Sequence, residues 1–443
     1  MFYILETEDQ LDWLEEQSSR GGYLDVITTN DMYHPYLTET VAIYIRPLES
    51  PQGYIIPIDH EEGLNVVKQR VYDILKKFTI LYVKNKKNLL YHLNLQDAID
   101  ISLIYSMNHY ERLELPDSST LINWYYIKHS SKKDLNKLIP LGKLYERCEN
   151  EYKHVFNTKK VDLNIPSGFD YYNKLAANVF FMVEQQGIGI QYESFVELFQ
   201  PRNPVHNIEC SVAYTQYNLY NSTSRPTNAF NSVNFAAIPK TREHRGVFTP
   251  INDFFVEFDF DGYHLRLLAE QVGYELTEES AHKQLAKLYF GKDEITDEEY
   301  LKAKQINFHA IYGKIPVQHK NLPIFRLIQQ FIDTMWRTYQ EEGVVYDPIS
   351  KKPFTKELED MHPAKLMNYM MQSLETSRNI RILKEVLRYL SGKHSKVVLY
   401  VYDAIIIDFK KEDGKETLEE LQKILEEGKK YPVKFQFSKD LSL

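Results

Sequence analysis

The sequence predicts a mixed α/β protein built from two domains. In the first third of the chain, short β-branched segments of alternating polarity are interleaved with a segment of helical periodicity. A polar stretch at residues 149–166 ends in Asn-Ile-Pro-Ser-Gly, which is typical of a domain boundary. The 443 residues are enough for two or three domains of about 100–200 residues each.

The first domain is predicted to span residues 1–155. Alternating β-branched and aromatic residues predict three strands, at 23–29, 40–45 and 53–58. Residues 64–78 have the apolar spacing of an amphipathic helix, and a short strand follows at 79–83. The second domain, residues 156–443, is predicted to open with a helix at 171–186. The fold class is therefore α/β of the α+β kind.

The composition excludes several classes of protein. Two cysteines, Cys148 and Cys210, are too few for a disulfide framework or a zinc cluster. The chain begins without a basic segment, and its apolar stretch at 397–407 is too short for a membrane span, so we expect a cytoplasmic protein without a membrane partner. The net charge of −9 does not exclude a nucleic-acid partner, because a local basic cleft can still form.

The first segment that carries chemistry is a predicted strand at 254–260 followed by a predicted helix at 261–270. Asp259 lies at the carboxyl end of this strand, where a side chain can face a cleft. The alternative is that these acids only cap the helix, with Asp261 as the N-cap residue.

The second segment is a predicted helix at 296–313. Thr296 and Glu299 form a capping box at its start, and Gly313 is suited to its end. Lys304, Phe308 and Tyr312 follow at intervals of four and share one face. An ammonium and two rings suit a nucleoside triphosphate. The alternative is an amphipathic helix whose rings belong to the core.

The third segment, at 397–409, has two apolar runs around one acid and predicts a β-hairpin with Asp403 at its bend. One interpretation is that Asp403 only stabilises the turn, as Asp residues commonly do. Two strand-end acids, Asp259 and Asp403, can also meet on adjacent strands. A converging carboxylate pair is what two Mg²⁺ ions, or Mn²⁺ in their place, need for phosphoryl or nucleotidyl transfer.

In this order and context the three segments resemble the polymerase motifs of the family A (DNA polymerase I-like) DNA polymerases. The resemblance implies an RNase H-like exonuclease-type domain followed by a right-hand polymerase fold with a palm sheet, helical fingers and a minimal thumb. The parts it implies are a thumb remnant at 170–224, a palm at 225–280 and 360–443, and fingers at 281–359.

The resemblance also implies a function and a set of site residues. The implied activity is template-directed addition of deoxynucleotides to a primer 3′ end, with primer-template DNA, dNTPs and a processivity or replisome protein as partners. Asp259, Asp403 and the carbonyl of Phe260 would hold the metal ions, with Lys304 as a further catalytic residue. Nucleotide binding falls to Lys304, Phe308, Tyr312 and His264. DNA binding falls to Arg225, Asn234, Asn368, Gln372 and Arg266.

The chain departs from this family at four places. Tyr300 stands where the family has an Arg that contacts the triphosphate. His264 stands where these polymerases usually carry a Glu that blocks the ribose 2′-OH, so sugar selection could be relaxed. Ala404 stands where they have a further Glu. The segment between Gly187 and Arg225 is too short for a long helical thumb, which predicts weak DNA binding or a partner that supplies the grip.

The first domain resembles the family's 3′–5′ exonuclease domain less closely. Asp-Val-Ile-Thr-Thr at 25–29 stands where the family has Asp-x-Glu-Thr-Thr. The positions expected to be remnants of the exonuclease site are Asp25, Ile27, Leu89, Asp100 and Glu149. Ile27 and Leu89 replace metal-binding acids, and an aliphatic side chain has no lone pair to offer a cation. We therefore predict a retained fold without proofreading, in a compact enzyme of viral or phage type.

Three other functions remain open at this point. One is a polymerase with relaxed dNTP/rNTP selection, and the second is a non-catalytic DNA-binding or replication scaffold derived from a polymerase. The third, a nuclease, is disfavoured by the aliphatic residues at the exonuclease positions.

Overall fold

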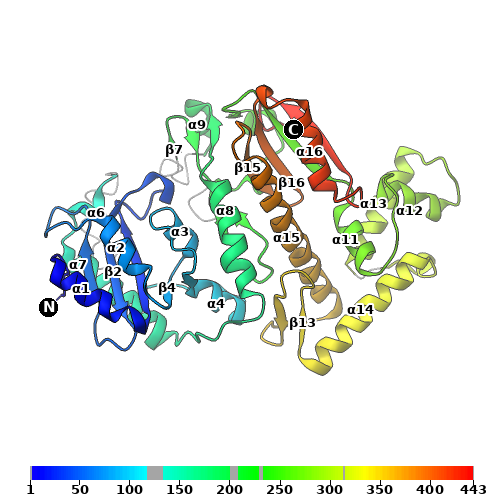
Figure 1. Ribbon diagram of the computed structural model, residues 1–443. Coiled ribbons are helices and arrows are strands. Elements are labelled where there is room, and N and C mark those ends of the chain that lie inside the picture. Colours follow the sequence, from blue (N-terminus) through cyan, green and yellow to red (C-terminus); the bar gives the residue numbers. More distant parts are fainter. Residues whose placement is uncertain (1, 117–132, 200–207, 229–232, 313–314, 443) are drawn as a thin grey trace.

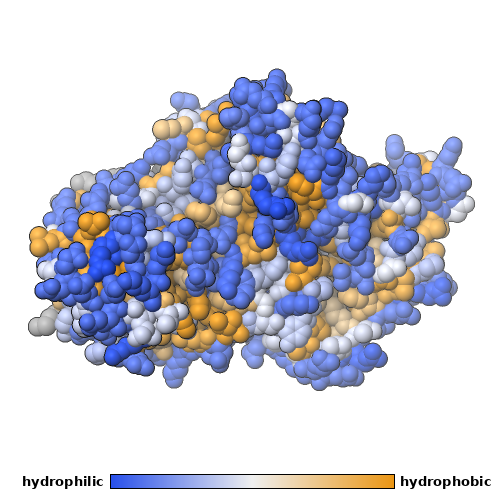
Figure 2. All heavy atoms as spheres, viewed as in Figure 1, coloured by the Kyte–Doolittle hydropathy of each residue, from blue (hydrophilic) through white to orange (hydrophobic). Residues whose placement is uncertain are grey.

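The computed structural model describes residues 2–116, 133–199, 208–228, 233–312 and 315–442 (Figure 1). Gly313, predicted to end a helix, lies outside the described residues. Hydrophilic side chains cover most of the face in Figure 2, with apolar residues in small groups between them. Within the described ranges, no helix combines the length and apolarity needed to cross a lipid bilayer.

The N-terminal part is built on a five-stranded sheet of order β3-β2-β1-β4-β5. Neighbours among β1, β2 and β3 are antiparallel, whereas β1, β4 and β5 pair in parallel. The strands are β1 (Gly22–Thr28), β2 (Thr40–Pro47), β3 (Tyr54–Pro57), β4 (Leu81–Val83) and β5 (Ile99–Asp100). This confirms the strands expected at 23–29, 40–45 and 53–58.

Both faces of this sheet are buried, which explains its nearly continuous apolar strands. Leu24 points into one core and its neighbours Tyr23 and Ile27 point into the other. The helices of this part are α1 (Glu8–Glu16), α2 (Lys68–Leu75), α3 (Lys86–Leu90), α4 (Ile101–His109), α6 (Leu135–Leu138) and α7 (Leu141–Lys153).

A second, antiparallel sheet of order β15-β16-β12-β17 lies in the C-terminal part. Its strands are β12 (Phe254–Phe260), β15 (Lys396–Val401), β16 (Ala404–Phe409) and β17 (Val433–Ser438). The long helix α15 (Pro363–Tyr389) packs against α16 (Lys415–Glu426). Figure 1 shows α15 beside β15 and β16. The expected strand at 254–260 and hairpin at 397–409 are confirmed.

Four helices form the lobe on the right of Figure 1. They are α11 (Tyr263–Gln271), α12 (Ala281–Phe290), α13 (Asp297–Ile311) and α14 (Pro323–Glu342). The capping box of Thr296 and Glu299 is present at the start of α13. Smaller elements complete the chain: α8 (Ala177–Glu184), α9 (Tyr192–Phe199), α10 (Arg242–Arg245), β6 (Ile188–Ile190), β7 (Ile208–Glu209), β8 (Val212–Ala213), β9 (Tyr217–Asn218), β10 (Thr227–Asn228), β11 (Phe248–Thr249), β13 (Val344–Tyr346) and β14 (Pro353–Thr355).

The two parts of the chain share a core. Leu103, Ile104 and Met107 of α4 belong to the same buried cluster as Phe180 and Val183 of α8. Buried apolar area of this kind is the main favourable term in folding. The N-terminal and C-terminal parts are therefore packed together rather than joined by a loose linker.

Candidate active site

Two acids from neighbouring strands open into one cavity. Asp259, near the end of β12, pairs in register with Ala404, the residue that follows Asp403. Asp403 lies in the two-residue turn between β15 and β16. Both acids line a cavity of about 500 Å³. The structure thus brings together two residues that are far apart in the sequence.

The electrostatics of this pair favour a cation. Desolvation in the cavity, together with the nearby charge of Asp403, raises the pKa of Asp259 to about 6. Desolvation and the charge of Glu375 also raise the pKa of Asp403. Carboxylates that repel one another are stabilised by a shared positive ion.

The donor atoms fit a hard divalent cation. Two carboxylates and the backbone carbonyl of Phe260 are the oxygen donors that Mg²⁺ and Mn²⁺ take. Among the residues that the structure describes, no group of three or more His, Cys, Asp or Glu side chains forms a metal centre. Mg²⁺ commonly binds through one or two carboxylates and takes its other ligands from water and phosphates. The pair therefore suits a divalent cation that takes its remaining ligands from water or from a bound molecule.

Asp261 has a structural role in spite of its place beside Asp259. Its carboxylate accepts hydrogen bonds from the Ala281 amide and from Lys434 Nζ, both at 3.0 Å. Although burial opposes ionisation, these bonds hold the pKa of Asp261 below its usual value. Asp261 thus caps α12 and anchors Lys434 in the cavity.

Arg266, which was expected to bind DNA, instead makes structural contacts inside the protein. Its side chain is buried, and its guanidinium donates to the backbone carbonyls of Asp261, Thr277 and Glu279 at 2.8–3.0 Å. With its donors used in this way, Arg266 holds the loop between α11 and α12. The expectation of a DNA contact is wrong for this conformation.

Lys304 and Phe308 of α13 also line this cavity, together with Tyr312, the residue that follows the helix. Phe308 is 60% exposed, which excludes the alternative that this ring belongs to the core. Its ring lies edge-on to Tyr312 with centroids 5.2 Å apart. A cation and an exposed ring thus share one cavity with the two carboxylates.

A polar network lines part of the cavity, and its central acid, Glu375, was not predicted from the sequence. His264 contacts both Tyr312 and Glu375, and Arg225 pairs with Glu375. Glu375 is fully buried on α15. The burial of this acid becomes apparent only in the tertiary structure, so the sequence could not indicate its role. Two further residues, His282 and Lys434, line the cavity and were also missed, whereas Tyr300, which the resemblance placed at a triphosphate-binding position, lines it too.

The other residues expected to bind DNA lie close to this network. Gln372 donates to Asn368 across one turn of α15 at 3.0 Å. Gln372 also accepts a hydrogen bond from Thr223 at 3.3 Å, two residues before Arg225. Asn234 is exposed at the start of a short helical turn. Arg225, Asn368 and Gln372 therefore form a linked group beside the cavity.

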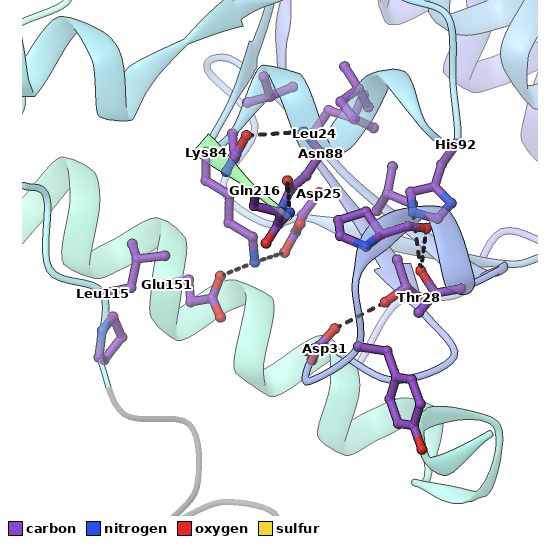
Figure 3. A pocket seen from close by; sticks show the side chains of 18 residues that line it. Leu24, Asp25, Thr28, Asp31, Lys84, Asn88, His92, Leu115, Glu151 and Gln216 are labelled. Atoms are coloured by element: carbon purple, nitrogen blue, oxygen red, sulfur yellow. Dashed lines mark hydrogen bonds and ion pairs between the residues drawn. The ribbon is translucent and has the colours of Figure 1, made fainter. Parts of the chain in front are cut away.

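A second cavity, of about 380 Å³, lies in the N-terminal part (Figure 3). Asp25 and Leu89, two of the positions predicted to be exonuclease remnants, both line it. Lys84 reaches between Asp25 and Glu151, with its Nζ 2.8 Å from a carboxylate oxygen of each. Burial opposes the charge of Lys84, but the two carboxylates raise its pKa well above the usual value. An internal ammonium therefore bridges this carboxylate pair.

Two of the expected remnant positions are elsewhere. Glu149 accepts hydrogen bonds from Tyr44, Arg46 and the Gly53 amide at 2.6–2.8 Å, away from the cavity. Successive helical residues are rotated by about 100°, so Glu151, two positions later on α7, faces the cavity instead.

Asp100 and Ile27 also serve the fold. Asp100 caps α4 through the Leu103 amide at 3.0 Å and accepts from Tyr220 at 2.8 Å. Ile27 is fully buried in the core of the first sheet. Glu149 and Asp100 therefore make structural contacts outside this cavity, and Glu151 is the acid of α7 that lines it.

Comparison with known proteins supports the architecture. No family model and no curated protein matched the chain. Among solved structures, it is similar to the POL domain of Pol1 from M. smegmatis, a structure in complex with DNA primer-template and dNTP. The TM-score is 0.68 at 12% sequence identity, over 100% of this chain and 99% of that one. The chain therefore has the fold of a DNA polymerase domain.

Proposed function

We propose that the chain is a template-directed DNA polymerase of the DNA polymerase I-like group, which adds deoxynucleotides to a primer 3′ end. One observation carries the proposal: Asp259 and Asp403 line a single cavity that is also lined by Lys304, Phe308 and Tyr312. The similar structure is a complex with DNA primer-template and dNTP, which supports the same partners for this chain.

Each residue has a role in this proposal. Asp259, Asp403 and the Phe260 carbonyl would hold Mg²⁺ or Mn²⁺, which when bound lowers the pKa of the attacking hydroxyl and offsets developing charge. Lys304 binds the triphosphate as a compact positive charge. Phe308 stacks on the base, while Tyr312 and His264 contact the sugar. Sequence information comes from pairing with the template.

The experiment that tests this proposal is single-nucleotide incorporation on four primed templates that differ in one template base. We expect each template to direct insertion of its complementary dNTP in the presence of Mg²⁺. Binding of primer-template DNA with no insertion of any dNTP would contradict the proposal and support a non-catalytic scaffold.

We also infer that proofreading is absent. Lys84 lies where a cation shared by Asp25 and Glu151 would lie, and Leu89 offers no ligand. Incubation of a 3′-labelled single strand with Mg²⁺ tests this, and we expect no shortening. Degradation that an Asp25→Ala change abolished would contradict it.

A further inference from the structure

Glu375 is a buried carboxylate that the proposed mechanism does not use. It lies on α15 with 0% of its side chain exposed, at the edge of the nucleotide cavity. Burying a lone carboxylate costs several kcal/mol, so a charge in this place needs partners. Its partners are His264 and Arg225, whose side chains are 20% and 22% exposed.

The contacts keep Glu375 ionised. His264 Nε2 lies 2.7 Å from one carboxylate oxygen, and Arg225 Nη2 lies 2.9 Å from the same oxygen and 3.0 Å from the other. Burial opposes ionisation, but the bonds and charges of these two residues hold the pKa of Glu375 below its usual value.

An ionised carboxylate fixes the imidazole of His264. A carboxylate only accepts hydrogen bonds, so His264 Nε2 carries a hydrogen and donates it to Glu375. The other ring nitrogen, Nδ1, lies 3.2 Å from the Tyr312 hydroxyl. Both ring nitrogens are therefore engaged, and Tyr312 is tied through His264 to the buried acid.

The Tyr312–His264 wall lies where the sugar of a bound nucleotide belongs. Among the residues that line the cavity, Lys304 and the cations held by the two aspartates suit the phosphates, and the exposed ring of Phe308 suits the base. The part of a nucleotide between phosphates and base is the sugar, which would contact His264 and Tyr312. A hydroxyl placed against a wall whose polar groups are already paired gains no partner there.

We propose that Glu375 is a positioning residue that locks the His264–Tyr312 wall and thereby sets discrimination between deoxyribonucleotides and ribonucleotides. The inference rests on the proposed polymerase function and extends it to a residue on another helix. Arg225, which holds the second face of Glu375, also lies over the ring of Tyr402 at 4.0 Å. Glu375 thus connects the sugar wall to the turn that carries Asp403.

The test is single-nucleotide insertion of one dNTP and the matching rNTP by wild type, Glu375→Gln, His264→Ala and the double variant. Loss of a hydrogen bond to a charged group is worth about a factor of ten or more. We therefore expect Glu375→Gln to lower the ratio of kcat/KM for dNTP over rNTP about tenfold. The KM for dNTP should rise more than its kcat falls, and the double variant should lose no more selectivity than His264→Ala alone.

A matched control is Glu385→Gln, the same change at a more exposed acid on α15 that pairs with Arg388; it should keep the wild-type ratio. The inference would be overturned if Glu375→Gln kept the wild-type selectivity. It would also be overturned if Glu375→Gln lowered the selectivity by the same factor in the wild-type and in the His264→Ala background. If Glu375→Gln fails to fold, an unchanged ratio in His264→Ala overturns it instead. Failure of wild type to insert any dNTP would reject the polymerase proposal itself, which is a different outcome.

Discussion

Asp403 owes its position to the backbone of its neighbour Tyr402. Tyr402 has a φ of +56°, a left-handed conformation that costs a residue with a Cβ about 1–2 kcal/mol. Two contacts hold it there: Asn379 donates to the Tyr402 carbonyl at 3.2 Å, and Arg225 lies over its ring. Strain retained in this way is common where a side chain must be aimed at a site.

The bridge formed by Lys84 predicts that its removal creates a cation site. In Lys84→Met, Asp25 and Glu151 lose the charge between them while remaining almost fully buried. We expect unfolding free energy to fall by about 2–3 kcal/mol, less than for a fully buried pair because Lys84 is 30% exposed. Mn²⁺ should restore part of the loss by binding the two carboxylates.

Thermal unfolding with and without Mn²⁺ measures this effect, and Lys153→Met is the matched control. Lys153 lies on the same helix as Glu151 and is 58% exposed, so its loss should change little. A Mn²⁺-dependent stabilisation of Lys84→Met no larger than that of wild type would contradict the bridging role.

At the scale of elements, α13 presents the exposed ring of Phe308 at the cavity, which predicts separable effects on binding and stability. Phe308→Ala should leave the unfolding free energy within about 0.5 kcal/mol, because the ring is exposed. It should raise the KM for dNTP about tenfold, since stacking on a base is worth about 1–3 kcal/mol. Steady-state insertion kinetics and urea unfolding measure the two effects.

Leu301→Ala is the control for this prediction, because Leu301 is 59% exposed on the same helix and does not line the cavity. It should change neither quantity. A KM in Phe308→Ala equal to that of wild type would remove this ring from the nucleotide site.

The segment between β13 and β14 predicts a pH-dependent stability. Lys352 is fully buried, and burial lowers its pKa to about 7. Above pH 7 the unfolded chain holds a proton that the folded chain has lost, so the free energy of unfolding rises with pH until the ordinary lysine pKa is reached. The buried lysine is therefore most costly below pH 7.

Replacing Lys352 with Met removes this cost. The advantage of Lys352→Met over wild type should be largest near pH 6 and should shrink by about 1.4 kcal/mol for each pH unit above 7. Urea unfolding at several pH values measures this difference in stability. Lys351→Met, the same change at the exposed neighbouring residue, is the control. A difference that stays constant with pH would contradict the assignment.

Local patterns predicted much of the site, and long-range contacts account for the rest. Asp259, Asp403 and the face of α13 were found because strand ends, a turn and a four-residue spacing are local signals. Glu375 and Lys84 became visible only with tertiary partners, because their roles depend on residues distant in sequence. The prediction for Arg266 failed for the same reason, because the burial of its side chain cannot be predicted from the residues beside it in the sequence.

At the scale of the whole molecule, the two parts should unfold together. Lys87 of α3 forms a buried ion pair with Glu184 of α8 and also donates to the Tyr217 carbonyl at 2.7 Å. Glu184→Gln leaves a buried ammonium without its counter-charge, which should cost about 3 kcal/mol or more. Calorimetry should show one transition at a lower temperature, whereas two separate transitions would contradict a shared core.

The most direct test of the account is insertion of one dNTP by wild type and by Asp403→Asn on the same primed template with Mg²⁺. An amide preserves the size of the side chain but removes the charge that a cation needs. We predict that the rate falls at least a hundredfold while the thermal stability of the variant stays close to that of wild type. Wild-type insertion by folded Asp403→Asn would show that the two acids do not form the catalytic pair.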